Sequence, residues 1–108
     1  MSSKIPILQE ISRERARQDE KWGEQNHPIV DYNYASPMNY RYNLPSEERV
    51  KNLCDFFAKE NELTWGDIVL EELVEALCAR NKENMREELV QCGAVIVAMI
   101  ESLDRNGK

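Results

Sequence analysis

The sequence predicts an all-α fold of the four-helix-bundle type, and three observations support this. Apolar residues recur three and four positions apart in four segments, which is the periodicity of amphipathic helices. Residues that favour helix starts precede two of these segments, and no segment shows the alternation of a half-buried strand. The 108 residues suit one small domain, and neither a repeat nor a linker divides them. We therefore expect a single domain over residues 1–108.

The first helix is predicted from about Ile7 to Gln25. Its apolar positions lie among charges, most of which have an opposite charge three or four residues away. This pattern is typical of a helix with a solvated face. His27 and Pro28 end the pattern, and we assign His27, the only histidine, a structural role.

Residues 27–45 are predicted to form a long irregular loop that carries all four tyrosines of the chain, Tyr32, Tyr34, Tyr40 and Tyr42. Loops of this length inside a small domain are often functional. The tyrosines can pack the loop down or stack on a nucleotide base. Packing is the preferred interpretation, because aromatic side chains pack more often than they bind.

The second helix is expected to begin after Ser46, a good N-cap, and to end at Asn61. The third begins after Thr64, which forms a capping box with Asp67, and runs to about Arg80.

After the polar turn 81–83, a fourth helix continues to about Arg105. Its segment 89–100 is apolar nearly all round, and such a helix in so small a domain needs a partner surface. We therefore expect a core completed by oligomerisation, in a homodimer or a dimer of dimers.

Composition excludes several classes of protein. The net charge of -6 argues against nucleic-acid binding through phosphate neutralisation. The longest apolar run is about half of the ~20 residues that a membrane span needs, so no membrane association is expected. Three cysteines without CxxC spacing indicate reduced thiols, and with no secretory signal they predict a cytoplasmic protein.

Two acidic clusters stand on the third and fourth predicted helices, and they lack charged partners. The first contains Glu71, Glu72 and Glu75, and the second contains Glu87 and Glu88. Charge runs are usually solvated helix faces. Here, however, no basic residue lies three or four positions from Glu71, Glu72, Glu75 or Glu88 on its own helix. Like charges at this spacing destabilise a helix, and an uncompensated cost of this kind indicates a functional site.

Helical spacing explains how these carboxylates could share a ligand. Glu72 and Glu75 are three residues apart, as are Glu88 and Gln91 on the next helix. A short turn makes the two helices antiparallel neighbours, so the two pairs can converge. Hard oxygen ligands of this kind suit Mg²⁺ or Mn²⁺. Glu87 is a weaker candidate, since with Asn84 as N-cap it would serve as a capping residue.

The motifs Glu71-Glu72-x-x-Glu75 and Glu88-x-x-Gln91 resemble those of the MazG-like nucleoside triphosphate pyrophosphohydrolases. Residues 17–25 and 89–95 resemble a short branch of that all-α family. The resemblance implies hydrolysis of a nucleoside triphosphate to the monophosphate and pyrophosphate. It implies Glu72, Glu75 and Glu88 as Mg²⁺ ligands and Glu71 as the residue that orients or deprotonates water.

The same resemblance implies substrate contacts for Lys21 with phosphate and Trp22 with the base. The alternatives are a surface lysine and a core tryptophan. Gln91 departs from the family pattern, which has Asp here, and the lost charge should weaken metal binding. Two other functions stay open: a nucleotide or metal sensor without turnover, which Gln91 suggests, and a helical interaction module built on the apolar segment 89–100.

Overall fold

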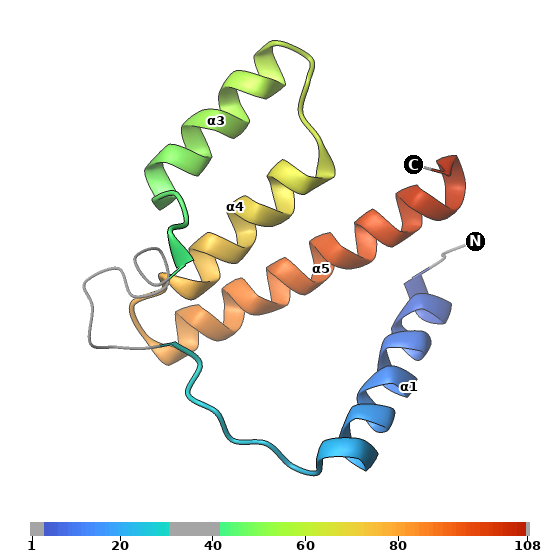
Figure 1. Ribbon diagram of the computed structural model, residues 1–108. Helices are drawn as coiled ribbons and strands as arrows, with labels where there is room; N and C mark the ends of the chain where they lie inside the picture. Colours follow the sequence, from blue (N-terminus) through green and yellow to red (C-terminus); the bar gives the residue numbers. More distant parts are fainter. Residues whose placement is uncertain (1–3, 31–41, 108) are drawn as a thin grey trace. The chain divides into compact units, whose positions relative to one another are not determined.

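A computed structural model describes residues 4–30 and 42–107 of the chain. These residues form four α-helices and no strand: α1 (Lys4–Trp22), α3 (Glu47–Lys59), α4 (Trp65–Leu77) and α5 (Lys82–Asn106) (Figure 1). The prediction of an all-α fold is confirmed for this part of the chain. The bundle arrangement and the oligomer stay predictions. Most of the tyrosine-rich loop, including Tyr32, Tyr34 and Tyr40, lies outside the described residues.

The chain divides into two compact units by its internal contacts. One unit comprises residues 1–28 and 97–108, and the other comprises residues 29–96. Helix α1 and the end of α5 belong to the first unit, whereas α3, α4 and the start of α5 belong to the second. The prediction of one domain over 1–108 stays a prediction, and we describe each unit separately.

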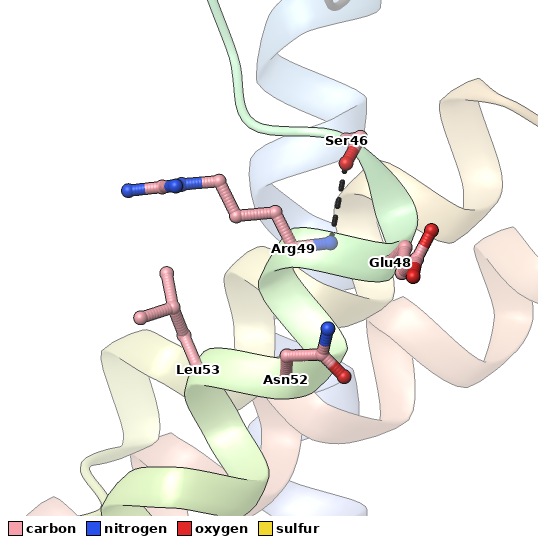
Figure 2. Close-up of a pocket in the computed structure, with 5 residues that line it drawn as sticks. All are labelled: Ser46, Glu48, Arg49, Asn52 and Leu53. Carbon is pink, nitrogen blue, oxygen red and sulfur yellow. Dashed lines mark hydrogen bonds between the residues drawn. The ribbon is translucent and has the colours of Figure 1, made fainter.

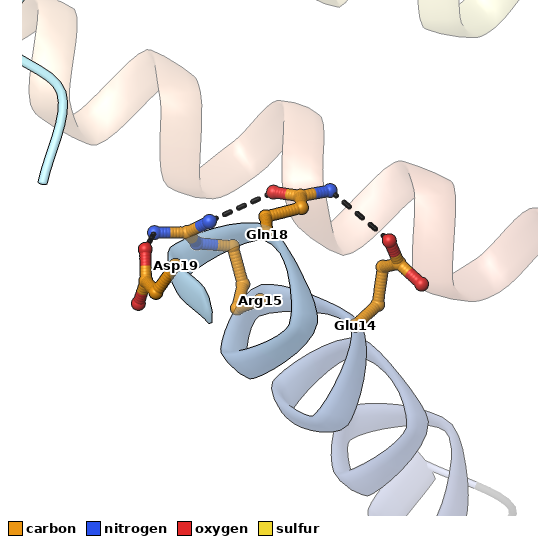
Figure 3. Close-up of polar contacts among 4 residues, drawn as sticks. All are labelled: Glu14, Arg15, Gln18 and Asp19. Atoms are coloured by element: carbon orange, nitrogen blue, oxygen red, sulfur yellow. Dashed lines mark hydrogen bonds and ion pairs between the residues drawn. The ribbon is translucent and has the colours of Figure 1, made fainter. Parts of the chain in front are cut away.

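Helix α1 carries a network of polar side chains on its surface (Figure 3). Arg15 donates to Asp19 at 2.8 Å and to Gln18 at 2.7 Å, and Arg17 pairs with Glu14. These contacts confirm two of the ion pairs expected from the sequence. Because their side chains are largely exposed, each contributes only a few tenths of a kcal/mol. The helix ends at Trp22, earlier than expected, where Gly23 takes a φ of 71°.

Helix α3 begins and ends as the sequence predicted. The Ser46 side chain accepts a hydrogen bond from the Arg49 amide at 3.2 Å. At the other end, Asn61 has a φ of 59°, and the amides of Asn61 and Glu62 donate to the carbonyls of Ala58 and Phe57. This pair of bonds is a Schellman motif, which satisfies carbonyls that the helix end leaves free.

The capping box before α4 is also confirmed. The Asp67 amide donates to the Thr64 hydroxyl at 3.2 Å, and the Thr64 amide donates to the Asp67 carboxylate at 2.9 Å. The helix ends at Leu77, three residues before the expected boundary.

Helix α5 begins after Asn81, and this changes the interpretation of Glu87. The Asn81 side chain accepts a bond from the Asn84 amide at 2.8 Å, and its carbonyl accepts one from Met85. Asn81 is therefore the N-cap, and Asn84 lies within the first turn. The suggested capping role of Glu87 is wrong, because Glu87 lies beyond the turn whose amides need a partner.

The apolar core of the second unit joins α3 to α4. Buried Val50 and Cys54 from α3 meet Val74 from α4, and Leu70 and Cys78 pack against them. Of the described helices, these two approach each other over the largest stretch. Helix α4 and the start of α5 run antiparallel (Figure 1). No helix among residues 4–30 and 42–107 has the length and hydrophobicity of a membrane span.

Candidate metal centre

Three carboxylates converge between α4 and the start of α5. Glu72 and Glu75 stand on one face of α4, and Glu88 stands near the beginning of α5. One carboxylate oxygen from each residue lies within 4.8 Å of the others. The structure therefore brings together three of the four residues that the sequence suggested as metal ligands.

Burial makes this cluster different from a solvated acidic face. All three residues are half-buried, and Oε2 of Glu72 and Oε2 of Glu88 are buried without a hydrogen-bond partner among the described residues. A buried carboxylate oxygen without a partner is costly, since water is removed and nothing replaces it. A ligand that bound these oxygens would remove this cost.

The pKa values of two carboxylates also distinguish the cluster from a solvated acidic face. Burial, followed by the nearby charges of Glu72 and Glu88, raises the pKa of Glu75 to about 7. Burial and then the charges of Glu88 and Glu71 also raise the pKa of Glu72. Like charges held together in a poorly hydrated site disfavour ionisation. Near neutral pH the cluster is therefore partly protonated, and a cation that binds would displace the proton.

The stability of the metal-free chain should consequently fall as pH rises. The pKa of Glu75 is raised from 4.5 to about 7 on folding, so the folded chain binds the extra proton between these values. Its contribution to stability is complete below the unfolded pKa and is lost as pH rises through the folded one. In EDTA, the melting temperature of the wild-type chain should fall as the pH rises from about 5 to about 8. The melting temperature of Glu75→Gln should fall less over the same pH range.

Glu87→Gln is the matched control for this measurement, because Glu87 is exposed on α5 and lies outside the cluster. The wild-type chain and Glu87→Gln should lose stability in parallel. If Glu75→Gln lost as much as these two over the same pH range, Glu75 would not carry the effect.

Glu71 and Gln91, the two other residues suggested from the sequence, are not among the three clustered carboxylates. Glu71 is half-buried, and it lies near enough to the Cys54 thiol of α3 to help raise the pKa of that thiol. The charge of Glu71 also acts on Glu72 and Glu75. Gln91 is exposed. The predicted roles of Glu71 with water and of Gln91 with the metal stay predictions.

Lys21 and Trp22 lie at the end of α1, in the other compact unit. The Lys21 amine lies 4.8 Å from the centre of the Trp22 ring, and Trp22 is 61% exposed. The alternative of a core tryptophan is therefore wrong, and the predicted substrate contacts stay predictions. Arg80, Lys82 and Arg86, which flank the acidic residues in sequence, are exposed.

Cys92 is a neighbour of the cluster that the sequence did not single out as part of it. Its side chain is buried, and burial together with the charge of Glu72 raises the pKa of its thiol. Cys92 follows Glu88 by four residues, so the two share one face of α5. This four-residue spacing was the feature of the sequence that could have identified Cys92 as a neighbour of the cluster.

The cluster suits a hard divalent cation. It offers three carboxylate oxygens from two helices, two of its oxygens lack partners, and no Lys or Arg in the described residues forms an ion pair with it. Mg²⁺ and Mn²⁺ prefer such oxygen ligands and leave further positions for water or phosphate.

Two hollows elsewhere on the described surface lack these features. One, of about 370 Å³, lies over the first turns of α3 (Figure 2) and is lined by Ser46, Glu48, Arg49, Asn52 and Leu53. Its Ser46 hydroxyl is already engaged as the helix cap. The other lies on α1 beside Glu10, Arg13 and Arg17. Neither gathers several acidic groups, so the carboxylate cluster is the stronger candidate.

The fold and the cluster together define a class: a helical chain with a three-carboxylate site between two antiparallel helices. No family model, curated protein or solved structure matches the chain. The resemblance to MazG-like proteins rests on the motifs quoted for it.

Proposed function

We propose that the protein is a Mg²⁺-dependent nucleotide pyrophosphohydrolase, which cleaves a nucleoside or deoxynucleoside triphosphate to the monophosphate and pyrophosphate. The observation that carries this proposal is the convergence of Glu72, Glu75 and Glu88, with two buried oxygens lacking partners. The resemblance of the two acidic motifs supplies the reaction. Removal of non-standard or excess nucleotides is a fitting role for such an activity.

Each acidic residue has a part in this proposal. Glu72, Glu75 and Glu88 hold Mg²⁺, or Mn²⁺ in its place, with Gln91 as a further ligand. A bound Mg²⁺ neutralises phosphate charge and lowers the pKa of a water molecule. Glu71 orients or deprotonates the attacking water. Lys21 contacts phosphate, and Trp22 stacks on the base.

The direct test is release of pyrophosphate and monophosphate from a panel of ribonucleoside and deoxyribonucleoside triphosphates with Mg²⁺. We expect cleavage of at least one member and none in EDTA. If Mg²⁺ raises the melting temperature but no triphosphate is cleaved, the chain is a metal or nucleotide sensor. If Mg²⁺ has neither effect, the metal site is wrong and an interaction module is the better description.

Exposed apolar side chains on α5 support the proposed homodimer or dimer of dimers. Leu89, Val90 and Ile96 are large apolar residues with substantial exposure in the single chain. A second copy covering them would complete the core, as the sequence pattern suggested. A cytoplasmic location is part of the same proposal.

Replacement of Gln91 tests whether it is a ligand. Gln91→Asp restores the charge of the family pattern and should tighten Mg²⁺ binding by about tenfold, because affinity follows the charge of the ligands. Isothermal titration calorimetry measures the change. Gln91→Leu should weaken binding if the amide oxygen is a ligand. Unchanged affinity in both variants would remove Gln91 from the site.

A further inference from the structure

The clustered core residues of the second unit hold α3 and α4 together. The core cluster of the described residues consists of Val50, Cys54 and Val74, with Leu70 and Cys78 packed against it. All of them belong to α3, to α4 or to the C-cap of α4. Burial of this apolar surface gives α3 and α4 a reason to associate at any metal concentration.

The start of α5 faces α4 through a less favourable contact. Glu88 of α5 meets Glu72 and Glu75 of α4, and these carboxylates repel one another whenever they are ionised. The two residues after Glu88 compensate little, since Leu89 is 40% exposed and Val90 is 59% exposed. Buried Met85 and Cys92, three residues before and four after Glu88, provide the modest apolar burial on this face.

We propose that the cation is also a structural clasp, which holds residues 82–96 of α5 against the α3–α4 pair. This inference rests on the proposed metal site. Two of the clustered carboxylates come from α4 and one from α5, so the full set exists only while α5 is in place. A divalent cation bound among the three carboxylates would attract all three, and this attraction would outweigh their mutual repulsion. Metal binding is thereby linked to the docking of α5.

Hydrogen exchange of the whole chain tests the clasp without measuring activity. In EDTA, amides of residues 86–92 should exchange faster than those of residues 50–56 in α3, because α5 opens while α3 and α4 remain together. At a Mg²⁺ concentration about 100 times the Kd found by calorimetry, exchange at residues 86–92 should slow by about 100-fold. Residues 50–56 should slow much less, so the difference between the helices shrinks.

Two variants sharpen this test. Glu88→Gln removes the repulsion and weakens the site, so residues 86–92 should exchange more slowly than wild type in EDTA and respond little to Mg²⁺. Glu87→Gln changes the neighbouring exposed residue in the same way and should behave as wild type. If Glu87→Gln lost the response to Mg²⁺ as fully as Glu88→Gln, the clasp would be wrong, since it requires the clustered carboxylate specifically.

The remaining outcomes separate the clasp from the proposed function. If calorimetry shows Mg²⁺ binding and triphosphates are cleaved, but residues 86–92 slow no more than residues 50–56, the clasp is overturned and the enzyme stands. If calorimetry shows no Mg²⁺ binding, the metal site and the clasp fall together. A clasp confirmed by exchange without triphosphate cleavage would leave the metal site structural and overturn the proposed reaction alone.

Discussion

Replacing Glu75 with glutamine is expected to reduce Mg²⁺-dependent pyrophosphate release by about 100-fold or more, because loss of a direct ligand should exceed the 10–100-fold effects of residues that only support one. Glutamine preserves the shape of the side chain and removes its charge. The Mg²⁺-induced rise in melting temperature should shrink with the activity. Glu72→Gln should behave similarly, since both carboxylates belong to the cluster.

The raised pKa of Glu75 allows loss of metal binding in Glu75→Gln to be distinguished from loss of folding. Burial and neighbouring charges raise that pKa to about 7, so the ionised side chain is a burden to the metal-free fold near neutral pH. Glu75→Gln should therefore be at least as stable as wild type in EDTA while being nearly inactive with Mg²⁺. Glu87→Gln should retain activity. A Glu75→Gln enzyme with wild-type turnover and a wild-type response to Mg²⁺ would refute the metal site.

Val74→Asp is expected to cost about 3–5 kcal/mol of stability, the effect of leaving an unpaired charge in a core. Val74 is 1% exposed and is the largest fully buried side chain among the described residues. Since small domains are stable by only about 5–15 kcal/mol, much of that stability would be lost. Urea denaturation followed by circular dichroism measures the change, and Val74→Ala provides a milder variant.

Val90→Asp is the matched control, because it makes the same substitution at an exposed position of α5. In the isolated chain its cost should stay within about 0.5 kcal/mol. The proposed oligomer adds a second expectation: a larger cost at high protein concentration than at low concentration. Equal losses for Val74→Asp and Val90→Asp at every concentration would contradict the core described for α3 and α4.

The helix boundaries show which local signals suffice. Ser46, Thr64 and Asn61 act where the sequence placed them, because each satisfies backbone groups a few residues away. The ends of α1 and α4 were each set three residues too late, since helical periodicity continues beyond the last residue that holds the conformation. The sequence did not distinguish Asn81 from Asn84 as the N-cap of α5, because both are equally good capping residues in isolation.

The acidic chemistry of the candidate site was predictable from the sequence, whereas the residues that surround the carboxylates were less so. The missing basic neighbours of Glu72, Glu75 and Glu88 were visible in the sequence, because helical spacing fixes which residues of one helix are adjacent. The buried thiol of Cys92 beside Glu72 was not, since it depends on how α5 meets α4. Nor was the contact of Glu71 with Cys54, which depends on the approach of α3.

The sequence by itself determined the helical class, the N-caps of α3 and α4 and the acidic motifs, because all of these depend on interactions within a few residues. Only the tertiary structure decided that three carboxylates from two helices lie within 4.8 Å and that two of their oxygens are buried without a partner. Those facts depend on packing between segments, which no local pattern encodes. They distinguish a candidate metal centre from an ordinary run of acidic residues on a helix surface.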